Sequence, residues 1–456
     1  MIDIILIGLP GLVALIVCIK RSPQYAFLNV YLPVLLLLPQ TYNWNISGQL
    51  CFADTAILPI ATMMSYRCWR SWKWNAMDVL VLAYVAVTVL SEGINKGYKL
   101  GQNLALQDTC AIILPYFAMV QTLRQGKDAV VAFAKRVGVA LVVIAVLSIY
   151  EFRMGVNLFT TLMDRFFPAQ PNTVVFRSGF MRIQGPYGHA ISAGAMMAIG
   201  FRIMRWLEWN GEWTESLGFL PLSKVRFCQI WIALGSLMTI SVGPWLGAAV
   251  GAIAVWLCRA RNRMQAILLL TLAVVLVGPP MYSSFENYVS VDPTVARFSG
   301  DRLQEDSAYR HKLLPAYIPV IEERMAWGWG RNEFPVIDGM ASIDNGYLLV
   351  ALTFGSYALL LQMALLIVPT LQLALRSLPF NREDTEATTA FTLIGIYTLL
   401  GLTLGTVWLG AAAGRFIFII NAWSSAWLKD CEIPAVSESR APLEIPNQCR
   451  FRRIMS

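Results

Sequence analysis

Apolar runs long enough to cross a bilayer recur along this chain, and they constrain its fold more than any other feature. Runs of roughly 16 to 25 residues match the length that a helix needs to span the hydrocarbon core. We place spans near residues 2–19, 25–38, 49–66, 77–91, 104–123, 130–152, 186–206, 227–242, 244–258, 265–282, 346–375, 387–408 and 411–428. The sequence therefore predicts an all-α fold, a polytopic integral membrane bundle of about twelve to fourteen transmembrane helices.

Composition supports the membrane assignment and argues against a soluble or nucleic-acid-binding protein. The chain is 57% hydrophobic and 14% charged, whereas soluble domains carry about 25% charged residues. The net charge of +8 has to be interpreted by location. No basic soluble face is apparent, so we expect no nucleic-acid partner. Residues 1–19 lack the basic start of a cleavable signal peptide, and we interpret them as a mature span.

The basic residues of the short loops predict the orientation of the bundle. They fall on one alternating side, at Lys20, Arg21, Arg67, Arg70, Lys73, Arg124, Lys127, Lys224, Arg226, Arg259, Arg261, Arg263, Arg376 and Arg382. Lys and Arg are enriched in cytoplasmic loops, so this side is expected to be cytoplasmic. We therefore expect a bundle over residues 1–428 in the bacterial inner membrane, with periplasmic loops at 153–185 and 283–344. A cytoplasmic tail would follow at 429–456.

The longer of these loops, residues 283–344, is a polar excursion that is not needed merely to join two membrane helices. It mixes six basic residues with a greater number of acids. Within it, Leu313, Tyr317 and Ile321 recur at helical spacing and would form one apolar face. Pro315 and Pro319 interrupt the stretch. We therefore expect a broken amphipathic helix over 309–325 that lies on the membrane surface or folds back over the bundle.

Several arginines on the predicted outer side go against the positive-inside bias. Arginine presents a planar fork of donors, stays charged and binds phosphate in bidentate geometry. An outer-leaflet substrate with a pyrophosphate group would need such partners. The alternative is that these are solvated surface arginines paired with nearby acids. The candidate pyrophosphate ligands are Arg182, Arg310, Arg302 and Arg331.

Three further residues are candidates for proton transfer. The two histidines, His189 and His311, both map to the outer side, and histidine is readily used as a base near neutral pH. Asp344 lies where the large loop re-enters the membrane. Such an acid is a functional candidate, although an N-cap of the following helix is an equal alternative. The sequence contains no CxxC and no His-rich metal spacing, so we expect neither a metal nor another cofactor.

Three short motifs carry a resemblance to a known family. Arg182 precedes Gly185 and His189 at the start of a span, and Arg310 is followed by Pro319, Gly328 and Gly330. The large loop then closes with Asp344, Asn345, Leu348 and Gly355. In this order and topology the chain resembles the O-antigen ligase and polysaccharide polymerase (Wzy-C) superfamily. That family has about a dozen helices and a large periplasmic loop near the C-terminal third.

The resemblance implies periplasmic glycosyl transfer from an undecaprenyl-pyrophosphate-linked saccharide, without a metal. Membrane lipid is an implied partner, and a chain-length regulator or a flippase is a further one. Where ligases have a histidine this chain has Asp344, so a polymerase is the better fit and a ligase the alternative. A transporter would be expected to place its ionisable residues near the midplane. A non-catalytic scaffold would tolerate replacement of the outer arginines.

Overall fold

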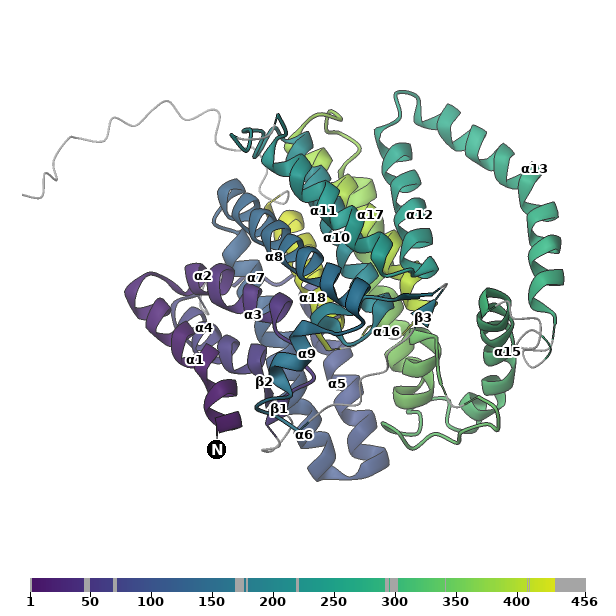
Figure 1. The fold of residues 1–456 in the computed structure, drawn as a ribbon, viewed down its shortest axis with the longest axis horizontal. Helices are drawn as coiled ribbons and strands as arrows, with labels where there is room; N and C mark the ends of the chain where they lie inside the picture. Colours follow the sequence, from purple (N-terminus) through teal and green to yellow (C-terminus); the bar gives the residue numbers. More distant parts are fainter. Residues whose placement is uncertain are drawn as a thin grey trace, which may run out of the picture.

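The structure is a computed structural model, and it is a bundle of α-helices (Figure 1). It describes residues 2–44, 50–68, 72–168, 176–177, 179–218, 221–291, 295, 302–340, 342–407, 409 and 411–430. The predicted cytoplasmic tail therefore lies, from residue 431 onward, outside the described residues. The all-α, polytopic membrane fold predicted from the sequence is confirmed.

The helices follow one another with few other elements. They are α1 (Ile2–Lys20), α2 (Pro23–Ala26), η1 (Phe27–Tyr31), α3 (Leu32–Leu37), α4 (Phe52–Cys68), α5 (Ala76–Lys96), α6 (Tyr98–Asp108), η3 (Thr109–Ile113), α7 (Leu114–Leu123), α8 (Lys127–Met154), α9 (Leu158–Met163), η4 (Gly185–Tyr187), α10 (Ala190–Trp209), α11 (Lys224–Met238), α12 (Val242–Arg259), α13 (Arg263–Val289), α15 (Arg302–Glu323), α16 (Gly346–Arg376), α17 (Thr385–Leu404) and α18 (Ala411–Asp430). Two short antiparallel ribbons pair β1 (Asn43–Trp44) with β2 (Leu50–Cys51) and β3 (Phe176–Arg177) with β4 (Phe180–Met181).

The centre of the bundle is built on α10, α17 and α18, which are buried along most of their length. Small residues let these helices approach closely, as is usual between membrane helices. A Cβ added to Gly251 of α12 would lie 2.5 Å from the Gly395 carbonyl oxygen of α17. Close packing of α12 on α17 fixes where α12 begins, and residues just before α12 contribute to the site described below.

Helices occupy the stretches where spans were predicted, and a test of length and hydropathy selects only some of them as long and apolar enough to cross a membrane. Seven of the described helices are long and apolar enough to cross a membrane, or eight if the bent α13 counts as one. Helices α4, α10, α11 and α18 occur where spans were expected, but they are shorter or more polar than this measure requires. Some of the charged residues on these helices are buried in the bundle, such as Asp54 of α4 and Arg415 of α18. The count of seven or eight rests on length and apolar composition alone, and it is lower than the twelve to fourteen spans predicted.

The large loop also differs from the prediction at its start and in its helix. Helix α13 continues to Val289, so the helical part extends past the expected boundary at residue 282. The helix bends by 44° between its two halves. The bend lies near Pro279 and Pro280, because proline removes a backbone hydrogen bond and bends a helix. Helix α15 is continuous through Pro315 and Pro319, and is not broken. Packing of its apolar face on α16 compensates for the lost hydrogen bonds, since Leu313 and Tyr317 are buried there.

Helix α16 is interrupted at Gly355, where φ is +83° and the backbone is not helical. The segment that follows α15 fills this break. Leu352 and Thr353 lose their helical partners there, and their carbonyl oxygens accept hydrogen bonds from the N–H groups of Trp329 (2.9 Å) and Gly330 (2.8 Å). The N–H of Ser356 donates to the Met325 carbonyl oxygen at 2.8 Å. The large loop is thus hydrogen-bonded to the backbone of a bundle helix.

Candidate active site

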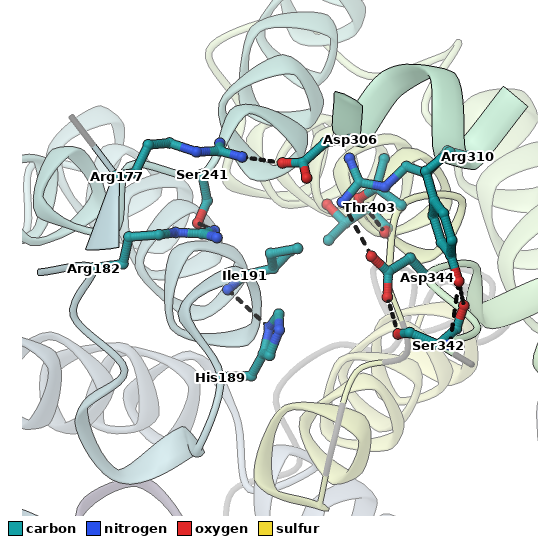
Figure 2. Close-up of polar contacts among 12 residues, drawn as sticks. Arg177, Arg182, His189, Ile191, Ser241, Asp306, Arg310, Ser342, Asp344 and Thr403 are labelled. Carbon is teal, nitrogen blue, oxygen red and sulfur yellow. Dashed lines mark hydrogen bonds and ion pairs between the residues drawn. The ribbon is translucent and has the colours of Figure 1, made fainter. Parts of the chain in front are cut away.

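The candidate site lies where α8 ends and where α10, α12 and α16 begin, which we call the loop end of the bundle. Figure 2 shows side chains from both large loops pointing toward one another there. The turn between Arg182 and α10 is fixed by Glu151, an acid of α8 that is 1% exposed. Its carboxylate accepts hydrogen bonds from the N–H groups of Gln184 (2.9 Å) and Gly185 (3.0 Å) and from Asn157 Nδ2 (3.0 Å). Three donors thus fix the turn to α8.

Arg182 is held in place by the residues that precede α12. Its Nε donates to the Thr239 carbonyl oxygen at 3.1 Å, and its guanidinium also donates to Ser241 Oγ at 2.8 Å. Guanidinium has five N–H donors, so donors remain for a ligand. Burial, and next the charge of Arg177, lower the pKa of Arg182 to about 10. It is nevertheless a cation at neutral pH, held in an orientation that leaves part of its fork facing the site.

Arg310 and Asp344 come from the second large loop and face each other across 3.7 Å. Asp344 accepts a hydrogen bond from Ser342 Oγ at 2.6 Å. Tyr309 fixes that segment, because its hydroxyl donates to the Ser342 carbonyl oxygen at 2.5 Å. The Nε of Arg310 is buried and has no hydrogen-bond partner within the described part of the chain. The contact with Asp344 therefore leaves the Arg310 guanidinium incompletely paired.

His189 begins α10 and acts as its N-cap. Its Nδ1 accepts a hydrogen bond from the N–H of Ile191 at 3.2 Å. Desolvation by the surrounding protein, and next the charge of Arg182, lower the pKa of this exposed ring. When the ring is neutral and Nδ1 accepts this hydrogen bond, its proton sits on Nε2, so Nε2–H can donate to a ligand. To act as the predicted base, His189 would have to give up the hydrogen bond at Nδ1.

An ion pair joins the two loops. Arg177 lies on β3 and pairs with Asp306 of α15. Its guanidinium also reaches the Ile240 carbonyl oxygen, at 3.4 Å, next to the groups that hold Arg182. The same charges act across the site, because Asp306, Arg310 and Asp344 all influence the pKa of Arg182. Arg182, Arg310, Asp344 and His189 thus form one electrostatic cluster built from segments far apart in sequence.

The comparison with protein families identifies the region that carries this cluster. Residues 227–363 match the Wzy_C family, described as O-antigen ligase. The predicted family resemblance is confirmed over these residues. They run from α11 into α16 and include Arg310, Asp344 and Gly355, whereas Arg182 lies before them. A comparison of the chain with curated proteins gives no match. The Wzy_C match supports, in a broad sense, a multi-pass membrane enzyme of the O-antigen ligase or polymerase type, similar to membrane glycosyltransferases.

Within this Wzy_C framework the structure separates the other predicted residues from the cluster. His311 is exposed on α15, and no described contact joins it to Arg310 or Asp344. Arg331 lies elsewhere, at α5 and α6, where it pairs with Glu92 at 3.1 Å and hydrogen-bonds to Gln107 at 3.1 Å. Arg302 begins α15, but its side chain lies outside what the structure describes. The N-cap of α16 is Asn345 and not Asp344, so the capping alternative for Asp344 is wrong.

Sequence reasoning missed Glu151, Thr239 and Ser241. The last two act through a backbone oxygen and a short hydroxyl, which carry no recognisable pattern. Glu151 had a signal, because it is an acid inside the apolar stretch 130–152. An acid in such a stretch is costly unless it has partners, and its three donors are those partners.

Replacing Glu151 with glutamine is expected to destabilise the turn that positions Arg182. The amide cannot accept from all three donors, and an unsatisfied buried group costs about 1–3 kcal/mol. Thermal unfolding of the purified protein in detergent would measure the loss. Glu215→Gln is the matched control, since Glu215 is 74% exposed and pairs with Lys224 on the surface. Equal unfolding temperatures for the two variants would contradict the anchoring role of Glu151.

Proposed function

We propose that this protein is a polysaccharide polymerase that acts on the periplasmic face of the bacterial inner membrane. It transfers a saccharide from an undecaprenyl-pyrophosphate carrier to an acceptor saccharide. The observation that carries the proposal is the convergence of Arg182 and Arg310 from two separate loops beside Asp344, with part of each guanidinium available. This convergence lies in and beside the region that matches the Wzy_C family.

The two arginines would stabilise the leaving group. Negative charge builds on the pyrophosphate as the bond from the anomeric carbon to the phosphate oxygen breaks, and positioned donors in a desolvated site stabilise such charge strongly. Arg182 is already oriented by Thr239 and Ser241, so little reorganisation is needed. Arg310 would exchange its 3.7 Å contact with Asp344 for the phosphate. Asp344, released from that contact, would then be available to the acceptor hydroxyl, so donor binding would prepare the acceptor step.

Asp344 would serve the acceptor. As the acceptor hydroxyl oxygen forms its bond to the anomeric carbon, its proton has to be accepted, and a carboxylate within reach can take it. Ser342 and Tyr309 hold the Asp344 segment in position. The Nε2–H of His189 would donate to a phosphate or sugar oxygen. His311, Arg302 and Arg331 are not needed for these steps.

The apolar surface beside the site suits a polyprenyl carrier and membrane lipid. Figure 1 shows α13 bending away from the bundle between α12 and α15. Its exposed side chains include Leu268, Leu272 and Leu276, each more than half exposed. A helix that exposes such residues requires lipid around it. A carrier tail in this lipid would bring its pyrophosphate to the loop end. A chain-length regulator or a flippase would meet the protein at the same face.

A ligase is the second candidate function, because the match to the Wzy_C family is compatible with both a ligase and a polymerase. Asp344 in place of a histidine favours the polymerase. A transporter would need ionisable groups inside the bundle. Such groups exist, since Asp54 and Arg415 are buried there, but they pair with each other. That pair is neutral as a whole, so it gives no reason to propose transport.

An in vivo polymer assay tests the proposal. Arg182→Ala and Arg310→Ala are each expected to lower polymer yield about 100-fold or more at matched expression, as loss of a charge-stabilising donor does. Arg310→Lys should recover little, because lysine lacks the planar fork. Arg226→Ala is the control, since Arg226 is 65% exposed and lies near the start of α11, away from the loop end.

The carrier-linked saccharides distinguish the outcomes. Single repeat units on the carrier would support a polymerase. Long chains that stay on the carrier would instead indicate a ligase. Normal polymer from Arg182→Ala and Arg310→Ala would contradict the proposed arginine site.

A further inference from the structure

A cavity lies between α5, α6, α16 and α18, apart from the arginine cluster. We call it the second cavity, because the arginine cluster is the first candidate site. The cavity volume is about 350 Å³, within the range of about 300–1,000 Å³ that small-molecule sites occupy. Arg331 and Asn332 of the large loop line one part of it, and Asp108, Gln362 and Arg415 line others. The proposed function above uses none of these residues.

Two polar side chains that line this cavity, Gln362 and Asp108, have acceptor capacity that the described protein groups do not use. Gln362 is 9% exposed, and its Oε1 is buried without a hydrogen-bond partner in the described chain. Buried polar atoms nearly always have partners, and an exception calls for an explanation. Asp108 accepts one hydrogen bond, from Thr88 Oγ1 at 3.2 Å, which leaves acceptor capacity on its carboxyl group. Both groups face a cavity large enough to hold their missing partners.

The charges argue against an anionic ligand. Arg415 is paired with Asp54 at 2.5 Å and Arg331 with Glu92 at 3.1 Å. With Asp108 added, the two cations meet three carboxyl groups, so the cavity carries no excess positive charge. This differs from the loop-end cluster, where the Nε of Arg310 has no hydrogen-bond partner among the described residues and only part of the Arg182 guanidinium is used by Thr239 and Ser241. Pyrophosphate therefore suits the cluster and does not suit the cavity.

The remaining wall is aromatic and aliphatic. Phe354, Phe418 and Tyr84 line the cavity, and the rings of Tyr84 and Phe418 lie 6.0 Å apart. Apolar walls with a few converging hydrogen-bonding groups are typical of sites for small organic ligands. An uncharged molecule with many hydroxyl groups and apolar C–H faces satisfies both kinds of wall. A sugar has this chemistry.

We propose that this cavity is a saccharide-binding subsite, in which Asp108 and Gln362 accept hydrogen bonds from the hydroxyl groups of a neutral sugar residue. The subsite rests on the proposed function, because the sugar would belong to the acceptor chain. Leu349 and Val350 line the cavity from the first turn of α16, which begins at Gly346, two residues after Asp344. At 1.5 Å per helical residue, Leu349 lies about 5 Å along the axis from the start of this helix. A sugar bound here would extend its chain toward Asp344.

Calorimetry on the purified full-length protein in detergent tests the subsite without turnover. The two probes are inorganic pyrophosphate and the repeat-unit oligosaccharide released by mild acid from the host's lipid-linked pool. Asp108→Asn keeps an acceptor for Thr88, and Gln362→Leu keeps the side-chain volume. Both are expected to weaken oligosaccharide binding at least tenfold and to leave pyrophosphate binding unchanged. Arg182→Ala should weaken pyrophosphate binding and leave oligosaccharide binding unchanged.

Gln121→Leu is the matched control. Gln121 lines a separate cavity of about 360 Å³ between α4, α5 and α7, and its Nε2 is also buried without a partner among the described residues. The Gln121→Leu variant should bind the oligosaccharide as the wild type does. The subsite is overturned if the wild type does not bind the oligosaccharide, or if Asp108→Asn and Gln362→Leu bind it normally. These results differ from failure of the proposed function, which would appear as normal polymer from the arginine variants.

Discussion

Replacing Gly355 with alanine is expected to leave little folded protein in the membrane. Gly355 has φ +83° and ψ −177°, a region that is accessible essentially to glycine alone. A Cβ at this position would lie 2.2 Å from the Ala326 carbonyl oxygen. Backbone strain of this kind costs about 1–3 kcal/mol. The clash adds to that cost because the opposing atom is backbone and cannot rotate away.

This change would affect both the arginine cluster and the cavity, because the large loop that contacts Gly355 contributes residues to each. If the backbone at Ala326 moves, Trp329 and Gly330 lose their hydrogen bonds to α16. Arg331 then no longer meets Glu92, and α15 loses the segment that ties it to the bundle. We therefore expect Gly355→Ala to unfold at much lower temperature than the wild type and to abolish polymer synthesis.

Gly8→Ala provides the control for this prediction. Gly8 lies in α1, and nothing lies within 4 Å of a Cβ added there. Alanine also has the higher helix propensity. Size-exclusion chromatography of detergent extracts, followed by thermal unfolding, would compare the two variants. A monodisperse Gly355→Ala protein with wild-type stability would show that the break in α16 does not depend on this glycine.

The fold class followed from the apolar runs, because a bilayer leaves few alternatives to helices. The number of helices that length and hydropathy select as spans is lower than predicted, since helices such as α18 carry charged residues that are buried in the bundle, for example Arg415. Periodicity found the apolar face of α15, which is buried through Leu313 and Tyr317. Proline alone predicts a break, yet Pro315 and Pro319 remain in a continuous helix because α16 stabilises that face.

Four of the residues selected from separate stretches of the sequence, Arg182, His189, Arg310 and Asp344, lie at one end of the bundle. Their roles in the reaction stay predictions. The state of His189 depends on the N–H of Ile191, which no side-chain pattern encodes. The sequence places Arg331 on the same side of the membrane as the other arginines, but the side alone does not predict which helices Arg331 contacts. Its partner Glu92 decides its place.

The pair Asp54 and Arg415 carries the second large expected effect, and no sequence pattern connects residues so far apart. Asp54 of α4 is 0% exposed and Arg415 of α18 is 7% exposed. Two hydrogen bonds, of 2.5 and 3.1 Å, join the guanidinium to both carboxylate oxygens. Replacing Arg415 with leucine leaves a buried carboxylate without its counter-charge. Breaking a buried pair in this way costs about 3–5 kcal/mol.

The double variant shows whether the damage comes from the stranded charge. Asp54→Asn combined with Arg415→Leu removes both charges and is expected to recover a large part of the lost stability, since neither buried charge remains unpaired. Thermal unfolding of the wild type, the two single variants and the double variant gives the coupling energy. Lys224→Leu, which breaks an exposed pair with Glu215, should change stability by about 0.5 kcal/mol or less. Single-variant losses that simply add in the double variant would mean that the pair contributes through packing alone. A recovery would show that α4 and α18 are joined by charge at the wall of the second cavity, so changes in what that cavity holds would act on the stability of the bundle.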